Sequence, residues 1–385
     1  MARLGDVCEV INGFAFKSEQ YVDSGIRIIR IANVQKGYLE DAAPVFYPSE
    51  SKEAKKYSLV EDDILMSLTG NVGRVAKLSR EFLPAALNQR VACLRIKDGV
   101  DIDKAFLFNL LNSDYFEQQC ISASKGVAQK NMSTEWLKEY EIPIFSLERQ
   151  RLIAGILDKT TELISLRKQQ LAKLDELVKA RFVEMFGDVI RNDKGWPQRV
   201  FSEIATSRLG KMLDAKQQTG KHSYPYLANF NVQWFRFELK SLNQMDFDED
   251  DQIEFALQEG DLLVCEGGEI GRCAVWHNEI QPCFFQKALH RVRCDRSVIL
   301  PDYLAWWFKY NCEHGGFSAI EGAKATIAHL PGAKLKSLIV TVPSVSIQEE
   351  FVAFVEQADK SKVVVQKALD EAQTLFESLM QQYFG

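Results

Sequence analysis

Two long segments of the chain repeat apolar residues at every seventh position. The first series runs through Leu157, Ile164, Leu171, Val178 and Met185. The second runs through Val355, Lys362, Leu369, Phe376 and Tyr383, where Lys362 interrupts the apolar pattern. No proline interrupts either segment, and glycine follows the first one at position 187. Seven-residue spacing is typical of helices that pair in a coiled coil. Two amphipathic helices that each pack only on their own globule are the alternative.

An antiparallel pairing within one chain is the easiest arrangement, because a whole globule separates the two helices along the sequence. Their contact would form an apolar seam along both helices. The residues predicted to form this helix seam are Leu157, Ile164, Leu171, Leu174, Val178, Val355, Val365, Leu369, Phe376 and Leu379.

The remaining segments have a mixed pattern. Short β-branched and aromatic runs, such as residues 26–31 and 236–239, lie between Gly, Asn and Asp turns and predict strands. The predicted fold class is α+β, with two tandem mixed α/β domains separated by two long helices in an antiparallel coiled coil. The predicted domain bounds are 1–147 for the first globule, 148–187 for the central helix, 188–343 for the second globule and 344–385 for the last helix.

The two halves of the chain resemble each other. Gly70–Arg74 corresponds to Gly268–Arg272 at an offset of 198 positions, and Gln150 corresponds to Gln348 at the same offset. Such a constant offset indicates a duplicated unit with small insertions in its loops.

Composition narrows the class of protein. The chain has 385 residues, 46% of them hydrophobic, and a formal net charge of -6, which excludes a disordered chain. No apolar run is long enough for a membrane span, so we expect a cytoplasmic protein without membrane partners. The 8 cysteines include no C-x-x-C pair, so we predict reduced thiols and no metal site.

Sequence signatures of catalysis are missing. There is no G-x-x-x-x-G-K-[ST] phosphate loop, no Asn-Pro-Pro or Asp-Pro-Pro step and no G-x-S-x-G elbow. All 5 histidines lie in the second half, so a duplicated histidine chemistry is excluded: His222, His277, His290, His314 and His329. We therefore predict that the chain has no catalytic residues and binds no cofactor of its own.

The end of the first globule carries the most specific motifs. Gly126–Ser133 reads Gly-Val-Ala-Gln-Lys-Asn-Met-Ser, and Ile142-Pro143 and Leu147–Gln150 follow it. With the duplicated globules and heptad helices, these motifs resemble the specificity subunit of type I restriction–modification enzymes. The second half departs from the pattern, because residues 322–327 contain no Gln or Asn and Val342-Pro343 replaces Ile-Pro.

The resemblance implies a function and partners. Each globule would be a target-recognition domain that reads one half of an asymmetric, bipartite sequence in double-stranded DNA. The helices would set the spacing and dock two methyltransferase subunits, which bind S-adenosylmethionine. A motor–nuclease subunit that uses ATP and Mg²⁺ would complete a restriction complex.

Neither globule is basic overall, so phosphate contacts would come from local clusters of cations beside amide side chains that suit base edges. The candidates in the first globule are Asn12, Lys17, Lys125, Gln129, Lys130 and Asn131. Those in the second are Lys211, Lys216, Lys221, Lys324 and Thr326. For each lysine, a solvated surface position is the alternative.

Two further groups leave alternatives open. Arg74 and Arg272 either contact phosphate or form buried salt bridges with Asp63 and Asp261. The aromatic side chains of Phe14, Phe16, Trp234 and Phe235 either stack on a displaced base or belong to the core. For the whole chain, a coiled-coil adaptor that binds only proteins and a diverged DNA methyltransferase or nuclease are the competing functions.

Overall fold

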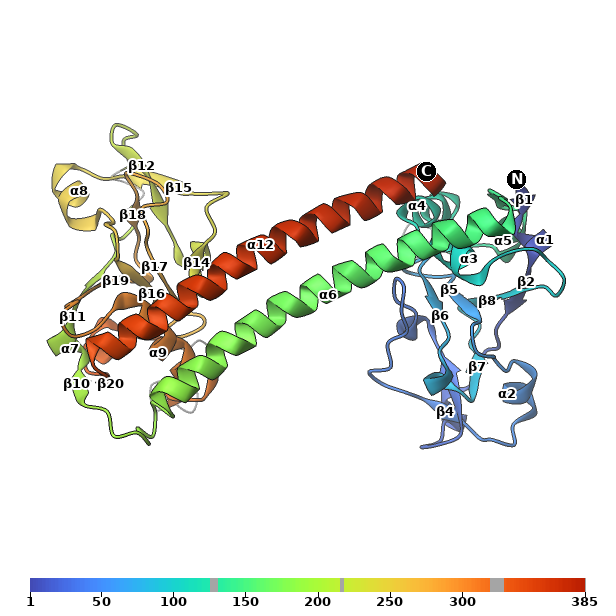
Figure 1. Ribbon diagram of the computed structural model, residues 1–385, viewed down its shortest axis with the longest axis horizontal. Helices are drawn as coiled ribbons and strands as arrows, with labels where there is room; N and C mark the ends of the chain where they lie inside the picture. Colours follow the sequence, from blue (N-terminus) through green and yellow to red (C-terminus); the bar gives the residue numbers. More distant parts are fainter. Residues whose placement is uncertain (125–130, 215–217, 319–328, 385) are drawn as a thin grey trace. The chain divides into compact units, whose positions relative to one another are not determined.

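The computed structural model describes residues 1–124, 131–214, 218–318 and 329–384 (Figure 1). They form two compact units. Unit 1 consists of Met1–Gln169 together with Gln366–Gly385, and unit 2 consists of Gln170–Val365. Each long helix therefore contributes one part to each unit.

The first unit is a mixed α/β domain. Its strands are β1 (Ala2–Arg3), β2 (Cys8–Asn12), β3 (Ile26–Ile29), β4 (Phe46–Tyr47), β5 (Ile64–Ser67), β6 (Val75–Lys77), β7 (Ala85–Leu87), β8 (Val91–Ile96) and β9 (Glu141–Ile142). Its short helices are α1 (Leu4–Val7), α2 (Lys52–Lys56), α3 (Lys104–Leu111), α4 (Asp114–Ala123) and α5 (Thr134–Glu139). The 3-10 turns are Ser18–Gln20, Ile31–Asn33 and Arg80–Phe82.

The second unit follows the same plan. Its strands are β10 (Gln198–Val200), β11 (Ala205–Leu209), β12 (Ser223–Leu227), β13 (Val232–Gln233), β14 (Arg236–Phe237), β15 (Asn243–Asp246), β16 (Leu262–Cys265), β17 (Cys273–Val275), β18 (Phe284–Phe285), β19 (Leu289–Cys294) and β20 (Ile339–Thr341). Its helices are α7 (Phe201–Ile204), α8 (Glu249–Phe255), α9 (Pro301–Glu313) and α11 (Gly332–Lys336), with a 3-10 turn at Asn229–Asn231.

Sheet topology shows that the fold is duplicated. A 4-stranded antiparallel sheet has the order β2-β8-β5-β6 in the first unit and β11-β19-β16-β17 in the second. A 3-stranded sheet has the order β4-β3-β7 in the first and β15-β12-β18 in the second, and its last pair is parallel in both. The central strands β5 and β16 are buried along their whole length, which explains why apolar residues predominate in them, with Ser67 the polar residue at the end of β5.

Gly13 and Gly210 mark a close approach that both units require. Each follows the first strand of its 4-stranded sheet and lies against the turn after β7 or β18. A Cβ at Gly13 would lie 2.2 Å from the Asn88 carbonyl oxygen, and one at Gly210 would lie 2.4 Å from that of Gln286. Only glycine lets the two backbones approach this closely.

The two long helices are α6 (Leu147–Phe186) and α12 (Val345–Phe384). In unit 1 the beginning of α6, with Leu157, shares a core with the end of α12, with Phe384. In unit 2 the end of α6 meets the beginning of α12, where Arg181 pairs with Glu350 at 2.6 Å and Asp175 with Lys362 at 2.7 Å. The antiparallel pairing predicted from the heptads is confirmed within each unit.

The residues of the helix seam lie on the inner faces of these helices. Leu157, Val178 and Leu369 are buried, and the remaining residues of the predicted seam are half-buried. Small side chains at Ala358 and Ala372 are buried beside them, which lets the two helices approach closely.

Candidate nucleic-acid interface

A glycine-bounded turn after the central strand organises the candidate site in each unit. In unit 1 it spans Thr69–Arg74, and Gly70 and Gly73 both have positive φ. The backbone returns to this turn at Asn131, which forms a β-bridge with Thr69, and Met132 N–H donates to the Leu68 carbonyl at 2.9 Å. The turn therefore holds Asn131, the last residue of the Gln-Lys-Asn motif.

Unit 2 repeats this arrangement. His329 forms a β-bridge with Gly267, and Leu330 N–H donates to the Glu266 carbonyl at 2.6 Å. The buried ring of His290 also bonds the Leu330 carbonyl through Nε2 at 3.0 Å. Burial lowers the pKa of His290, so the neutral imidazole is favoured at this position.

Arg74 and Arg272 hold the turns to a neighbouring segment. Arg74 donates to the Gln35 side chain at 3.0 Å. Arg272 donates to the backbone and side-chain oxygens of Asn229 at 3.0 and 3.1 Å. Both arginines are half-buried, so each side chain bonds to the neighbouring segment and is also in contact with solvent.

The salt bridges considered for these arginines belong to other residues. Asp63 accepts two hydrogen bonds from Arg95, at 2.8 and 2.6 Å. Asp261 accepts two from Arg293, at 2.7 and 3.2 Å. The interpretation that Arg74 and Arg272 pair with these buried carboxylates is therefore wrong, since the bidentate partner comes from β8 or β19.

The other candidates of unit 1 lie at the surface wherever the structure describes them. Asn12, Lys17 and Asn131 are exposed. Asn12 is the last residue of β2, and Asn131 forms the β-bridge with Thr69. The Asn12 side-chain amide donates to the Thr134 hydroxyl at 3.5 Å. Lys125, Gln129 and Lys130 lie outside the described residues.

In unit 2, Lys211 and Lys221 have different surroundings. The Lys211 ammonium contacts the carboxylate of Asp251, bonds the Asp246 carbonyl at 2.7 Å and lies 5.2 Å from the centre of the Phe247 ring. It is therefore engaged inside the unit, whereas Lys221 is exposed. Lys216, Lys324 and Thr326 lie outside the described residues.

The aromatic candidates pack within their units. Phe14 stacks on Tyr57 at 5.4 Å, and Phe16 is buried against Tyr47. The Trp234 indole N–H donates to Glu269 at 2.7 Å, and Phe235 stacks on Trp306 at 4.4 Å. These contacts agree with the packing interpretation for Phe14, Phe16 and Trp234, whereas Phe235 packs on Trp306 but is 40% exposed.

Sequence reasoning missed two buried residues next to the exposed lysines, Tyr47 and Asp246. Both bond to the loop that follows the first strand of the 4-stranded sheet in their unit. They differ chemically and lie one register position apart, so no matching pair in the two halves of the sequence marks them.

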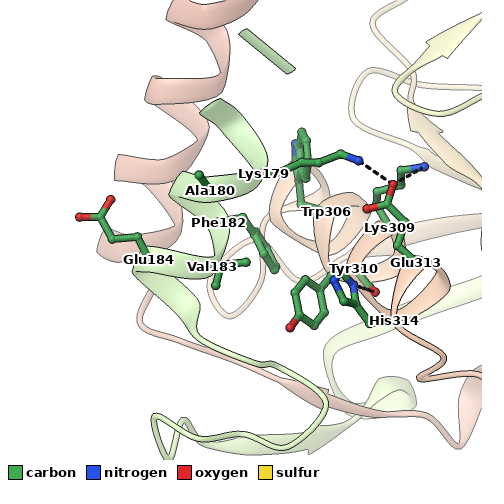
Figure 2. A pocket seen from close by; sticks show the side chains of 10 residues that line it. All are labelled: Lys179, Ala180, Phe182, Val183, Glu184, Trp306, Lys309, Tyr310, Glu313 and His314. Carbon is green, nitrogen blue, oxygen red and sulfur yellow. Dashed lines mark hydrogen bonds and ion pairs between the residues drawn. The ribbon is translucent and has the colours of Figure 1, made fainter. Parts of the chain in front are cut away.

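A pocket of about 670 Å³ lies in unit 2 between the end of α6 and α9 (Figure 2). Phe182, Val183, Trp306 and Tyr310 line it with apolar surface. At its rim Glu313 bonds Lys179 at 2.8 Å and Lys309 at 3.1 Å, as Figure 2 shows. These ion pairs largely neutralise the charges at the rim, and the apolar side chains that line the pocket remain uncovered.

Unit 1 contains a pocket of about 500 Å³ at the equivalent place. Met380 and Gln381 stand where Phe182 and Val183 stand in unit 2, and Asn112 and Ser113 correspond to Lys309 and Tyr310. The duplication therefore places two related pockets on the chain, one beside the second half of each long helix.

Two further features of the described residues concern metal binding and membrane spans. No group of three or more His, Cys, Asp or Glu side chains is placed there to hold a metal ion. No helix in the described ranges has both the length and the apolarity of a membrane span.

A family model for the type I restriction modification DNA specificity domain matches residues 1–176 and 193–372. This chain therefore belongs to the type I restriction–modification DNA specificity family, as its motifs predicted, and its role is in DNA sequence specificity. The matches give no support to a protein-only adaptor or a diverged methyltransferase.

Individual relatives carry the same description. The chain is 24% identical over 409 residues to the type I restriction enzyme EcoKI specificity subunit of Escherichia coli K12, covering 100% of this chain and 88% of the relative. It is 23% identical over 416 residues to the EcoBI specificity subunit of Escherichia coli, covering 99% and 84%.

Solved structures share the fold. The S subunit of a type I restriction–modification system from M. genitalium gives a TM-score of 0.58 at 15% identity, with 100% of this chain and 95% of the other covered. A chain from a study of complex assembly and conformational transition of the type I R-M system gives 0.63 at 14% identity, covering 100% and 96%.

Proposed function

We propose that each unit reads one half of an asymmetric, bipartite DNA target. The observation that carries this proposal is a duplicated scaffold with unlike surface loops. The glycine turn and the returning segment recur in both units, but Asn131 in one corresponds to His329 in the other. Two copies of one scaffold with different side chains at the same place suit two different half-sites.

The residues proposed to contact DNA in unit 1 are Asn12, Lys17, Arg74, Lys125, Gln129, Lys130 and Asn131. Exposed amides can pair with adenine edges, and the cations can neutralise phosphates. In unit 2 they are Lys216, Lys221, Arg272, Lys324 and Thr326. Lys211 is not among them, because its ammonium bonds to Asp251 and to the Asp246 carbonyl within the unit. The proposed domain bounds keep the globules at 1–147 and 188–343, with helices between and after them.

The chain would act without catalysis of its own, as the specificity subunit of a DNA methyltransferase or endonuclease complex in the cytoplasm. S-adenosylmethionine, ATP and Mg²⁺ would bind to the partner subunits. A methyl-transfer assay with the isolated chain tests this point, and transfer without any partner would contradict it.

The decisive test of DNA readout is the methylation pattern in cells that express the chain with its methyltransferase partner. Sequencing of modified bases should give one motif made of two unlike halves with an unread gap. A palindromic motif, or methylation independent of this chain, would contradict the proposal.

The duplicated pockets support the docking of two methyltransferase subunits. Corresponding surfaces on the two copies would take two copies of the same partner. The apolar floor of the pocket in unit 2 suits an amphipathic helix, whereas polar side chains line most of the pocket in unit 1. Val183→Glu places a charge at a pocket residue that is 45% exposed, so the fold should tolerate it.

Native mass spectrometry of the assembled complex measures this effect. The Val183→Glu complex should retain one methyltransferase subunit, whereas the control Lys173→Glu, at an exposed position of α6 outside the pocket, should retain two. Two subunits on both variants would show that the pocket is not a docking place.

A further inference from the structure

The loop after the first strand of each 4-stranded sheet carries an exposed lysine. In unit 1 residues 13–25 join β2 to β3 and carry Lys17, and in unit 2 residues 210–222 join β11 to β12 and carry Lys221. Both lysines are exposed, but the backbone that carries each one is held by a buried side chain of the adjacent 3-stranded sheet.

Tyr47 and Asp246 are these buried side chains, and they lie one register position apart on the corresponding edge strands β4 and β15. Tyr47 on β4 pairs with Ile26, the first residue of β3. Asp246 on β15 pairs with Ser223, the first residue of β12. Tyr47 is 3% exposed and Asp246 is 8% exposed. Because Ile29 and Leu227 lie at the same place beside β7 and β18, Tyr47 corresponds in register to Met245, and Asp246 is its neighbour on the strand.

Tyr47 holds the first loop directly. Its hydroxyl oxygen accepts a hydrogen bond from the Lys17 backbone N–H at 3.2 Å, and its O–H donates to the Gln20 side chain. One phenol therefore fixes the lysine and the 3-10 turn that follows it.

Asp246 holds the second loop through a larger set of bonds. Its carboxylate accepts the backbone N–H of Thr219, the Thr219 hydroxyl at 2.8 Å and the Gly220 N–H at 2.8 Å. The Thr219 hydroxyl oxygen in turn accepts the Lys221 N–H at 3.3 Å. The contact with the lysine that is direct in unit 1 is thus relayed through a threonine in unit 2.

The backbone of Asp246 joins the two ends of the same loop. Its N–H donates to the Gln218 side chain at 2.8 Å, and its carbonyl accepts the Lys211 ammonium at 2.7 Å. Lys211 stands at the beginning of the loop and Gln218 near its end. A single residue therefore connects both ends of the loop to the sheet.

We propose that Tyr47 and Asp246 are positioning residues that set how Lys17 and Lys221 meet DNA, each for its own half-site. The proposal rests on DNA readout by the two units. A lysine whose own backbone is held before binding loses less conformational freedom in the complex, so the residue that holds it favours the correct complex without touching DNA. Because the anchors lie in separate units and differ in chemistry, each can be removed alone.

The test uses the full chain co-expressed with its methyltransferase partner, with sequencing of modified bases as the readout. Asp246→Ala removes both carboxylate oxygens that can accept hydrogen bonds from the loop. Asp246→Asn keeps one side-chain oxygen at a similar place. Tyr47→Phe removes only the hydroxyl. Asp250→Asn is the matched control, because it removes a charge at an exposed position of α8 near Asp246 without a bond to the loop.

Asp246→Ala should lower base discrimination in the second unit's half-site by about tenfold, because a displaced phosphate contact shifts the register of that unit against its bases, and leave the other half-site unchanged. Asp246→Asn should restore part of it. Tyr47→Phe should relax the other half-site only, and Asp250→Asn should change neither. A defect in folding alone would instead reduce methylation at the intact motif without making either half degenerate.

An unchanged motif in Asp246→Ala and Tyr47→Phe, or equal degeneracy of both halves in each variant, would overturn the proposal. If Asp246→Ala yields no folded chain, the same comparison rests on Asp246→Asn and Tyr47→Phe. A wild-type complex without a bipartite motif would instead overturn the proposed DNA readout, so the two failures are distinguishable.

Discussion

Gln150 and Gln348 make the same hydrogen bonds at equivalent places in the two units. Each is fully buried in the first turns of a long helix. The Gln150 side chain accepts the Asp103 N–H at 2.8 Å and donates to the Phe145 carbonyl at 2.8 Å. Gln348 likewise accepts the Leu300 N–H and donates to the Pro343 carbonyl, both at 2.8 Å. Each glutamine thus joins a long helix to the start of α3 or α9.

Gln150→Ala should destabilise unit 1, because backbone groups at Asp103 and Phe145 lose their partner. A buried polar group without a partner costs about 1–3 kcal/mol. Hydrogen exchange followed by mass spectrometry should show faster exchange at the beginning of α3 and unchanged exchange at the beginning of α9. Gln348→Ala should reverse this pattern. The control Gln169→Ala, at an exposed position of α6, should leave both sites protected.

Replacement of Gln129 and Asn131 by alanine should relax one half-site only. A lost bidentate contact costs about 1–3 kcal/mol against the correct base. Competition binding of the assembled complex to duplexes with single-base changes measures the loss at each position. Unchanged preference at every position would mean that this segment has a structural role.

The pH dependence of stability should report on His290. An unfolded histidine titrates near pH 6.5. Burial lowers the pKa of His290 in the folded chain, and nearby Glu266 opposes this while Lys336 adds to it. As the pH falls below about 6.5, the unfolded state therefore takes up the proton first and the folded state loses stability, whereas above that pH the contribution is complete.

The measurement is the urea midpoint of unfolding at about pH 7.5 and about pH 5.5, on either side of the ordinary histidine value. The midpoint of the wild-type chain should fall more between these conditions than that of His290→Gln. The exposed His222→Gln serves as the control and should behave as wild type. Equal falls in wild type and His290→Gln would contradict the prediction.

Lengthening both long helices by one heptad should widen the unread gap in the DNA target. Insertions between Gln169 and Gln170 and between Val365 and Gln366 keep the seam in register and add about 10 Å to each helix. At about 3.4 Å per base pair, the gap should increase by up to about three base pairs. Methylation-motif sequencing decides the matter, and an active variant with the original gap would show that the helices do not set the spacing.

The sequence was sufficient for the architecture because the duplicated pattern has strong physical signals. Heptads, buried strands and the 198-residue offset depend on apolar periodicity, and the helices Leu147–Phe186 and Val345–Phe384 follow directly from it. The site was less predictable, because it depends on which polar groups meet across strands. Arg95, and not Arg74, reaches Asp63 because its strand, β8, runs antiparallel beside β5.

The anchors show the same limit. Tyr47 and Asp246 have no chemical likeness, and each meets its loop only through the pairing of β4 or β15 with the neighbouring strand. Lys211 is a candidate phosphate contact from the sequence because it follows a glycine at the start of a loop, but the fold directs its ammonium to Asp251. Long-range pairing of this kind leaves no local pattern for sequence analysis to find.

The end of α12 belongs to the core of unit 1, where the Phe384 ring meets that of Phe106 at 5.5 Å. During synthesis, residues 170–365 therefore emerge from the ribosome before unit 1 can complete its core. The first globule to be synthesised is therefore the last to complete its core. Until then, its apolar surface around Phe106 and Leu157 is accessible to chaperones and proteases. A chain cut short before this helix ends would leave that apolar surface around Phe106 uncovered.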